Sequence, residues 1–233
     1  MRMQEQIRPQ QIYKREFFER VMSLSPESLL DVGCGEGELL KAATEAGCTV
    51  CAGIEPDPAI VSRMRGQGLD VRLARAESLP FADRSFDVVT FEYVAHHVEF
   101  LERVLAEAVR VARRAVMILE PWYDASLPAQ QVALDFDHWM KVIDRRLGRV
   151  HNPCVDPARL AAEFCSHGLR INYSCRLLHQ DISLSRVEST AREQLATIGG
   201  CPILEGKLVR LLDRVRLRGM TEDGALTLCA RRD

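Results

Sequence analysis

The chain has 233 residues, which is enough for one domain with a sizeable hydrophobic core. Apolar residues make up 47% of it and charged residues 27%, as in an ordinary globular protein, and no run approaches the roughly 20 apolar residues of a membrane span. The formal net charge of −2 argues against a general nucleic-acid clamp.

The start of the chain and its cysteines bear on the cellular compartment. The segment Met1–Gln6 is polar and lacks the apolar block of a secretory signal, so we expect a cytoplasmic protein. Most of the eight cysteines lie in apolar segments, which favours buried thiols over disulfides or a metal site.

Strand-like and helical patterns alternate over the first half of the chain. An amphipathic stretch at 10–24 predicts a helix ahead of the first strand. Apolar runs then predict strands at 28–32, 49–54, 71–74, 86–91 and 115–119. Helical spacing predicts helices between them at 38–46, 58–66 and 98–112. This alternation is typical of a parallel sheet with right-handed crossovers.

The pattern changes after residue 121. Residues 124–150 look helical, and a helix at 156–167 begins with Asp156 as its cap and Pro157 in its first turn. Strands are expected at 169–178 and 225–230, with a helical insert at 182–223 between them. We therefore expect an α/β fold: a Rossmann-like, doubly wound, seven-stranded, mostly parallel sheet with helices on both faces, plus an N-terminal helix and helical insertions.

A glycine-rich turn follows the first predicted strand, in the segment Leu30–Glu38 with the sequence LDVGCGEGE. Glycines permit a tight turn with close ligand approach, and open α/β sheets bind nucleotides at such turns. A dinucleotide-binding turn would place Gly or Ala where this chain has Glu38, whose carboxylate would repel a pyrophosphate. The turn therefore disfavours a nicotinamide cofactor.

An acidic residue closes the second predicted strand. Glu55 lies 24 residues after Asp31, about one strand–helix–strand unit downstream. A carboxylate at that place can accept hydrogen bonds from both hydroxyls of a ribose. A solvated acid at a strand end is the alternative, which the glycine turn upstream disfavours.

The segment Ala74–Phe81 (ARAESLPF) and the following Ser85–Val89 complete the pattern. With them, residues 25–120 resemble the class I S-adenosylmethionine-dependent methyltransferases, especially the branch that includes quinone-biosynthesis C-methyltransferases and small-molecule enzymes. That resemblance implies S-adenosylmethionine as cofactor and S-adenosylhomocysteine as its product.

The resemblance also implies roles for individual residues. The methionine portion and the ribose would be lined by Asp31, Gly33, Cys34 and Gly35. Glu55 would hold the ribose hydroxyls, with Pro56 beside the adenine. Ala76 and Glu77 would meet the adenine edge, and Phe91 would lie near the sulfonium. Many relatives carry Asp where this chain has Arg75; because Arg75 cannot accept a hydrogen bond, we expect the adenine contact to come from elsewhere, with Glu77 as a candidate.

Methyl transfer from a sulfonium is a direct displacement that needs orientation and no metal. The polar residues after the fourth and fifth predicted strands are the candidates for the chemistry: His96, His97 and Glu92 as catalytic residues, and Tyr93, Glu120, Trp122 and Tyr123 around the substrate. An imidazole titrates near neutral pH, which suits a general base. Core packing is the alternative for the Trp122–Tyr123 pair.

We expect one methyltransferase domain over 1–233, with 25–120 as its cofactor-binding half and the helical insertions 121–155 and 182–223 around an acceptor pocket. The expected acceptor is a small organic molecule. Three alternatives stay open: a non-catalytic S-adenosylmethionine-binding sensor or partner subunit, an RNA methyltransferase that uses the arginines between 210 and 218, and a nicotinamide-dependent oxidoreductase. The acceptor atom and the oligomeric state are also open, a homodimer included.

Overall fold

The structure of the chain is a computed structural model that describes residues 8–232, so the segment Met1–Gln6 discussed above lies outside the described residues. The strands are β1 (Ser28–Val32), β2 (Val50–Glu55), β3 (Asp70–Leu73), β4 (Phe86–Glu92), β5 (Ala112–Trp122), β6 (Arg170–Arg176) and β7 (Gly224–Arg231). The α-helices are α1 (Pro9–Met22), α2 (Glu38–Glu45), α3 (Pro58–Gly66), α4 (Leu101–Val111), α5 (Pro128–Arg146), α6 (Pro157–Ser166), α7 (Leu184–Thr197) and α8 (Pro202–Arg218).

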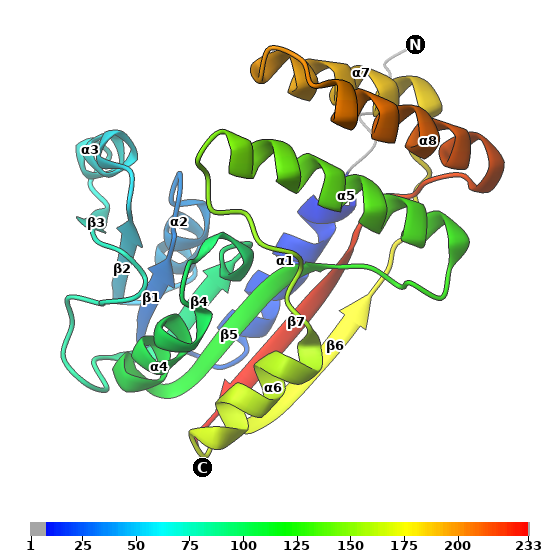
Figure 1. The fold of residues 1–233 in the computed structure, drawn as a ribbon. Helices are drawn as coiled ribbons and strands as arrows, with labels where there is room; N and C mark the ends of the chain where they lie inside the picture. The colour runs from blue at the N-terminus through cyan, green and yellow to red at the C-terminus, as the bar shows by residue number, and fades with distance from the viewer. Residues whose placement is uncertain (1–7, 233) are drawn as a thin grey trace, which may run out of the picture. The chain divides into compact units, whose positions relative to one another are not determined.

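The seven strands form one sheet in the order β3-β2-β1-β4-β5-β7-β6. The neighbouring pairs among β1 to β5 are all parallel, and β7 runs in the opposite direction to β5 and β6 (Figure 1). All five residues of β1 are buried, as expected of a strand covered on both faces. Figure 1 shows α4 and α6 in front of the sheet and α1 and α2 behind it. The predicted Rossmann-like α/β fold is confirmed.

One predicted helix and one predicted strand begin at residues other than those expected. The helix expected from residue 98 begins at Leu101, because Val98 has an extended backbone (φ −100°, ψ 148°) after a short 3₁₀ helix at Ala95–His97. The strand expected from residue 115 begins at Ala112, which pairs with Phe86. The guanidinium of Arg113, within this extension, forms an ion pair with Asp87 at 2.6 Å.

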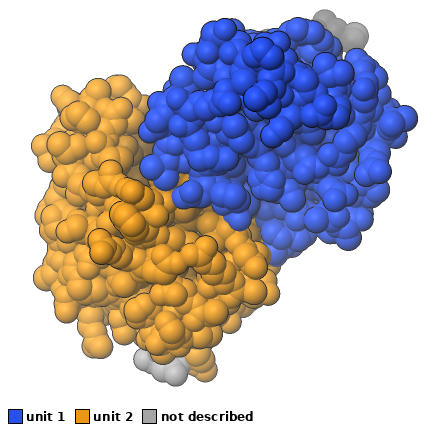
Figure 2. Space-filling view, viewed as in Figure 1, with its two compact units in different colours: residues 1–11, 121–154, 175–225 blue, residues 12–120, 155–174, 226–233 orange. Residues whose placement is uncertain are grey.

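The chain divides into two compact units, coloured in Figure 2. Unit 2 takes residues 12–120, 155–174 and 226–233 and holds most of the sheet. Unit 1 takes residues 1–11, 121–154 and 175–225, and its helices α5, α7 and α8 enclose their own apolar core. In that core the rings of Phe136 and Trp139 stack with their centroids 5.8 Å apart. The helices predicted in both insertions are therefore present, and their role around an acceptor stays a prediction.

Three smaller expectations can be compared with the structure. The side chain of Asp156 caps α6 by accepting a hydrogen bond from the backbone N–H of Ala158 at 2.8 Å, as predicted. All eight cysteines fall within the described residues, and no disulfide joins any of them. Within residues 8–232, every helix is too short or too polar to cross a membrane.

Candidate active site

The glycine turn after β1 has the backbone conformation that the sequence predicts. Gly33, Gly35 and Gly37 all have positive φ angles, of 72°, 48° and 69°. The backbone N–H groups of Gly33 and Cys34 both donate to the carbonyl of Ile54 in β2, at 2.9 and 3.0 Å. A Cβ atom at Gly33 would lie 2.7 Å from Cγ2 of Val94, whereas one at Gly35 would meet nothing within 4 Å. The turn is therefore closely packed at Gly33 and bordered by open space at Gly35.

Glu55, the last residue of β2, faces this turn. Its carboxylate accepts a hydrogen bond from the N–H of Gly35 at 3.1 Å and another from the N–H of Asp57 at 3.3 Å. An ionised carboxylate offers about four acceptor positions. Two of these remain for the hydroxyls of a ribose, so Glu55 and the open space beside Gly35 fit the adenosyl group that the sequence predicts.

Asp31 and Cys34 differ from their predicted roles because their side chains point into the protein. Asp31 is 3% exposed, and its carboxyl group accepts a hydrogen bond from the hydroxyl of Thr90 at 2.8 Å. Burial raises the pKa of Asp31 to about 7. The thiol of Cys34 packs against β2, where a Cβ atom at Gly53 would lie 2.6 Å from its sulfur. Cys34 can therefore line a ligand only through its backbone.

The loop expected to meet the adenine contains Ala76 and Glu77, both half-buried, whereas Pro56, which was expected beside the adenine, is exposed. Arg75 forms an ion pair with Glu77 at 3.3 Å and a longer one with Glu99 at 3.8 Å. Arg75, which stands where many relatives carry Asp, thus forms an ion pair with Glu77, the residue that was predicted to replace that Asp. Glu77 can still accept a further hydrogen bond through its remaining lone pairs.

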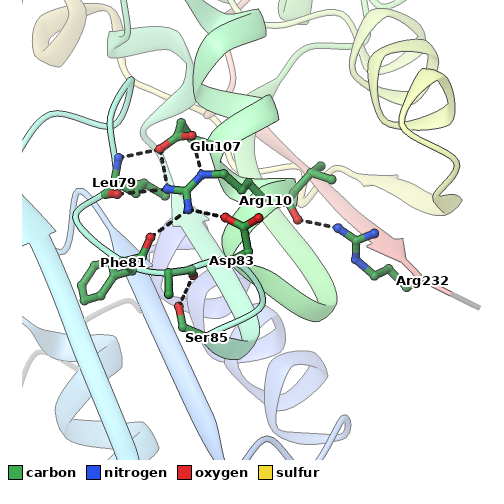
Figure 3. Close-up of polar contacts among 9 residues, drawn as sticks. Leu79, Phe81, Asp83, Ser85, Glu107, Arg110 and Arg232 are labelled. Carbon is green, nitrogen blue, oxygen red and sulfur yellow. Dashed lines mark hydrogen bonds and ion pairs between the residues drawn. The ribbon is translucent and has the colours of Figure 1, made fainter.

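A hydrogen-bond network that the sequence did not reveal fixes this loop to α4 (Figure 3). The carboxylate of Glu107 accepts from the N–H of Leu79 at 2.8 Å, and Arg110 donates to the carbonyls of Leu79 and Phe81 at 3.1 and 2.8 Å. Arg110 also pairs with Glu107 at 2.7 Å and with Asp83 at 2.9 Å. Glu107 and Arg110 are three residues apart on the polar face of α4, a spacing that could have indicated the pair.

The end of β4 contains three predicted site residues. Phe91 is fully buried in the sheet, so its side chain is part of the core. Glu92 forms an ion pair at 2.6 Å with Lys14 of α1, a partner that the sequence did not predict. Burial lowers the pKa of Lys14, but the hydrogen bond and charge of Glu92 outweigh it and leave that pKa raised. Tyr93 has a φ of 59°, a strained conformation for a residue with a side chain, and such strain often accompanies functional sites.

His96 and Glu120 form a buried pair at the ends of β4 and β5. The Nδ1 atom of His96 lies 2.5 Å from a carboxylate oxygen of Glu120, and the second oxygen accepts from the N–H of Ala95 at 2.8 Å. His96 is 5% exposed and Glu120 is fully buried, whereas the neighbouring His97 is exposed. Glu120 was predicted to contact substrate; its carboxylate is fully buried and bound to the His96 imidazole.

The remaining predicted residues lie in unit 1. Trp122 packs against β7, where a Cβ atom at Gly224 would lie 3.1 Å from its ring. Tyr123 lines a cavity of about 330 Å³. In the arginine run of α8, Arg214 pairs with Asp135 at 2.5 Å and Arg216 with Asp213 at 2.6 Å.

Comparison with known proteins agrees with this arrangement. A family model described as a methyltransferase domain matches residues 30–119. The chain is 33% identical over 121 residues to the ribosomal protein L11 methyltransferase of Laribacter hongkongensis, covering 50% of this chain and 39% of that protein. It is 35% identical over 121 residues to the ubiquinone/menaquinone biosynthesis C-methyltransferase UbiE of Dinoroseobacter shibae, covering 47% of this chain and 48% of that one.

These matches span less than half of each curated relative's length. The fold extends further: the crystal structure of the YcgJ protein from Bacillus subtilis superposes with a TM-score of 0.66 at 18% identity, covering 94% of this chain and 98% of that one. The family match begins at Leu30 and ends at Leu119, so it includes the glycine turn, Glu55, the adenine loop and the end of β4. Residues 30–119 are therefore similar in sequence to a methyltransferase domain, and the chain as a whole is similar in fold to the YcgJ protein.

Proposed function

We propose that the chain transfers the methyl group of S-adenosylmethionine to a small organic acceptor by direct displacement. When bound, the cofactor supplies a methyl group activated by a positively charged sulfur. The tasks left to the chain are to bind the cofactor, to orient the acceptor and to take up a proton where the acceptor must lose one. Orientation alone can supply up to roughly 7–11 kcal/mol of the barrier.

The observation that carries this proposal is the Glu55 carboxylate beside the N–H of Gly35, next to open space. In our proposal Glu55 accepts hydrogen bonds from the ribose hydroxyls, Gly33 and Gly35 allow close approach, and the loop at Ala76 and Glu77 meets the adenine. The Arg110 and Glu107 network supports this role, because it fixes that loop to α4.

We assign His96 as the base that takes the acceptor's proton, at Nε2. Glu120 acts as a positioning residue, since its bond to Nδ1 selects the tautomer in which Nε2 is the basic nitrogen. Glu92, the other predicted catalytic acid, is engaged by Lys14, so we assign it to holding α1 at the end of β4. We keep His97, Tyr93 and Trp122 as candidates for acceptor contacts.

Turnover tests the proposal. The full chain is incubated with isotopically methyl-labelled S-adenosylmethionine and a library of small organic acceptors, and mass spectrometry detects labelled products and S-adenosylhomocysteine. We expect product with at least one acceptor and none with His96→Ala. Cofactor binding without turnover across the library would contradict the proposal and favour a sensor or partner subunit.

Three further expectations from the sequence remain predictions: a cytoplasmic location, a homodimer and the absence of a nucleic-acid substrate. The pairing of Arg214 and Arg216 with acids supports the last of these, because paired arginines offer less charge to a phosphate backbone. Sedimentation and RNA titration would check the oligomeric state and the RNA affinity.

A further inference from the structure

The cavity in unit 1 has a lining that is part apolar and part charged, with Arg186 and His151 as its basic residues. Its volume of about 330 Å³ suits a small organic molecule. Phe136, Met140 and Met220 contribute apolar surface. The acidic part of the lining consists of four residues, Asp137, Asp144, Glu222 and Asp223.

Three of these carboxylates already have a basic partner. The ion pairs, at 2.8, 2.7 and 2.9 Å, are Asp137 with Lys141, Asp144 with His151, and Glu222 with Arg186. Lys141 is almost completely buried, so its charge is committed to Asp137. These three pairs leave one lining carboxylate to be accounted for.

That carboxylate is Asp223, whose hydrogen-bond partner is the neutral side-chain amide of Gln10. Over residues 8–232, no Lys, Arg or His side chain forms an ion pair with it. Burial raises the pKa of Asp223 to about 6; the Gln10 amide opposes that rise, and the charges of Glu222 and Asp137 add to it. Asp223 is therefore mostly ionised at neutral pH without a countercharge, a state that an incoming cation would stabilise.

Tyr123 contributes a polar group and an aromatic ring to the lining of the cavity. Its partly exposed hydroxyl forms no hydrogen bond with any residue that the structure describes. Burial, and then the charges of Asp137 and Asp223, raise its pKa well above 10, so the phenol stays protonated. The oxygen of a phenol can accept a hydrogen bond from an ammonium group, and its ring face attracts cations.

We propose that this cavity binds a small organic cation, an amine with an apolar body, through the carboxylate of Asp223 and the phenol of Tyr123. The apolar body would pack against Phe136 and Met140. The inference has a second part, which rests on the proposed function: the bound amine is the methyl acceptor. An anionic ligand of the same shape would be repelled by the carboxylate of Asp223, and a neutral one would leave Asp223 without a countercharge.

The test uses matched triples of an amine, its isosteric alcohol and its isosteric carboxylate on four apolar bodies: hexyl, phenylethyl, cyclohexylmethyl and indolylethyl. Binding to the full chain is measured by thermal shift and titration calorimetry. We expect at least one amine to bind, its alcohol to bind about tenfold more weakly, and its carboxylate to show no binding. If no amine binds, or if alcohols or carboxylates bind as tightly as amines, the proposal is overturned.

Two variants test whether the amine binds at Asp223. Asp223→Asn should weaken amine binding about tenfold. It should also reduce the ratio between the affinity for the amine and the affinity for its isosteric alcohol. The control is Asp213→Asn, an exposed aspartate of the same unit that pairs with Arg216 and does not line the cavity. Unchanged amine affinity in Asp223→Asn would overturn the assignment of that residue.

S-adenosylhomocysteine binding is measured on the same samples and tests the proposed function separately. If the amine binds but S-adenosylhomocysteine does not, the proposed function fails and the amine site stands. Methylation of the tightest-binding amine, detected by mass, would identify it as an acceptor. Amine binding with no methylation of any bound amine would refute that identification.

Discussion

Replacing Asp31 by Asn should stabilise the protein, although Asp31 lies in the glycine-turn segment. Burial raises the pKa of this carboxyl group from 3.8 to about 7, so the folded chain keeps a proton that the unfolded chain releases. At about 1.4 kcal/mol per pH unit between those values, the cost at pH 8 approaches roughly 4 kcal/mol. The side-chain carbonyl of Asn can still accept from Thr90, but burying its amide costs about 1–2 kcal/mol, which leaves a gain of roughly 2 kcal/mol.

The difference in unfolding free energy between Asp31→Asn and the wild type depends on pH. Well below pH 3.8 the Asp31 carboxyl is protonated in both states and contributes nothing to the difference. As the pH rises from 4 to 7 the wild type loses stability relative to Asp31→Asn, and above pH 7 the difference is constant. Urea unfolding of both proteins at pH 5, 6, 7 and 8 measures it. A difference that stays flat or reverses sign over this range would refute a protonated Asp31.

Asp87→Asn is the matched control, since Asp87 is another buried aspartate on the neighbouring strand β4. Burial raises its pKa, but the hydrogen bond from Arg113 and those from the backbone N–H groups of Glu27 and Ser28 outweigh it and leave the pKa lowered. This carboxylate therefore contributes stability at neutral pH that is lost as the pH falls through its folded-state pKa. We expect Asp87→Asn to destabilise the protein at pH 7, the opposite of Asp31→Asn.

Two other substitutions test the turn and the buried pair. Gly33→Ala should cost roughly 2–4 kcal/mol of unfolding free energy, because it combines a positive φ with a clash against Val94, whereas Gly35→Ala should cost about 1–2 kcal/mol. Equal losses in urea unfolding would refute the clash, and Val94→Ala should rescue part of the Gly33→Ala loss. Glu120→Gln should lower kcat roughly tenfold to hundredfold while the affinity for S-adenosylhomocysteine is unchanged, and Glu120→Asp should keep partial activity. A parallel loss of affinity for S-adenosylhomocysteine would indicate that Glu120 has a purely structural role.

Much of the sheet was predictable because its signals are local. Five apolar strand-like segments with short helical connections leave few arrangements other than a parallel sheet. The glycines of the turn and Glu55 at the end of β2 follow from the same local pattern, since the carboxyl ends of neighbouring parallel strands meet at one edge. The structure accordingly brings Gly35 and Glu55 into hydrogen-bond contact.

The side-chain partners were not predictable, because they depend on register and on contacts between distant segments. Asp31 and Cys34 were expected to face a ligand, but their orientation follows from the strand pleat and the turn geometry. Lys14 reaches Glu92 across 78 residues of sequence, and nothing in the apolar stripe of the first helix indicates that contact. The acidic cavity is assembled from α5 and residues near Tyr123 and Asp223, so its composition emerges only after folding.

The most direct test of cofactor binding at the glycine turn is a calorimetric titration of S-adenosylhomocysteine into the full-length wild type and Glu55→Ala, with circular dichroism to show that both are folded. We expect saturable binding of one molecule per chain to the wild type and at least a tenfold weaker affinity for Glu55→Ala, because two hydrogen bonds from the ribose hydroxyls would be lost. Equal affinities in the two folded proteins, or no binding to the wild type, would contradict the placement of the cofactor beside Gly35 and Glu55.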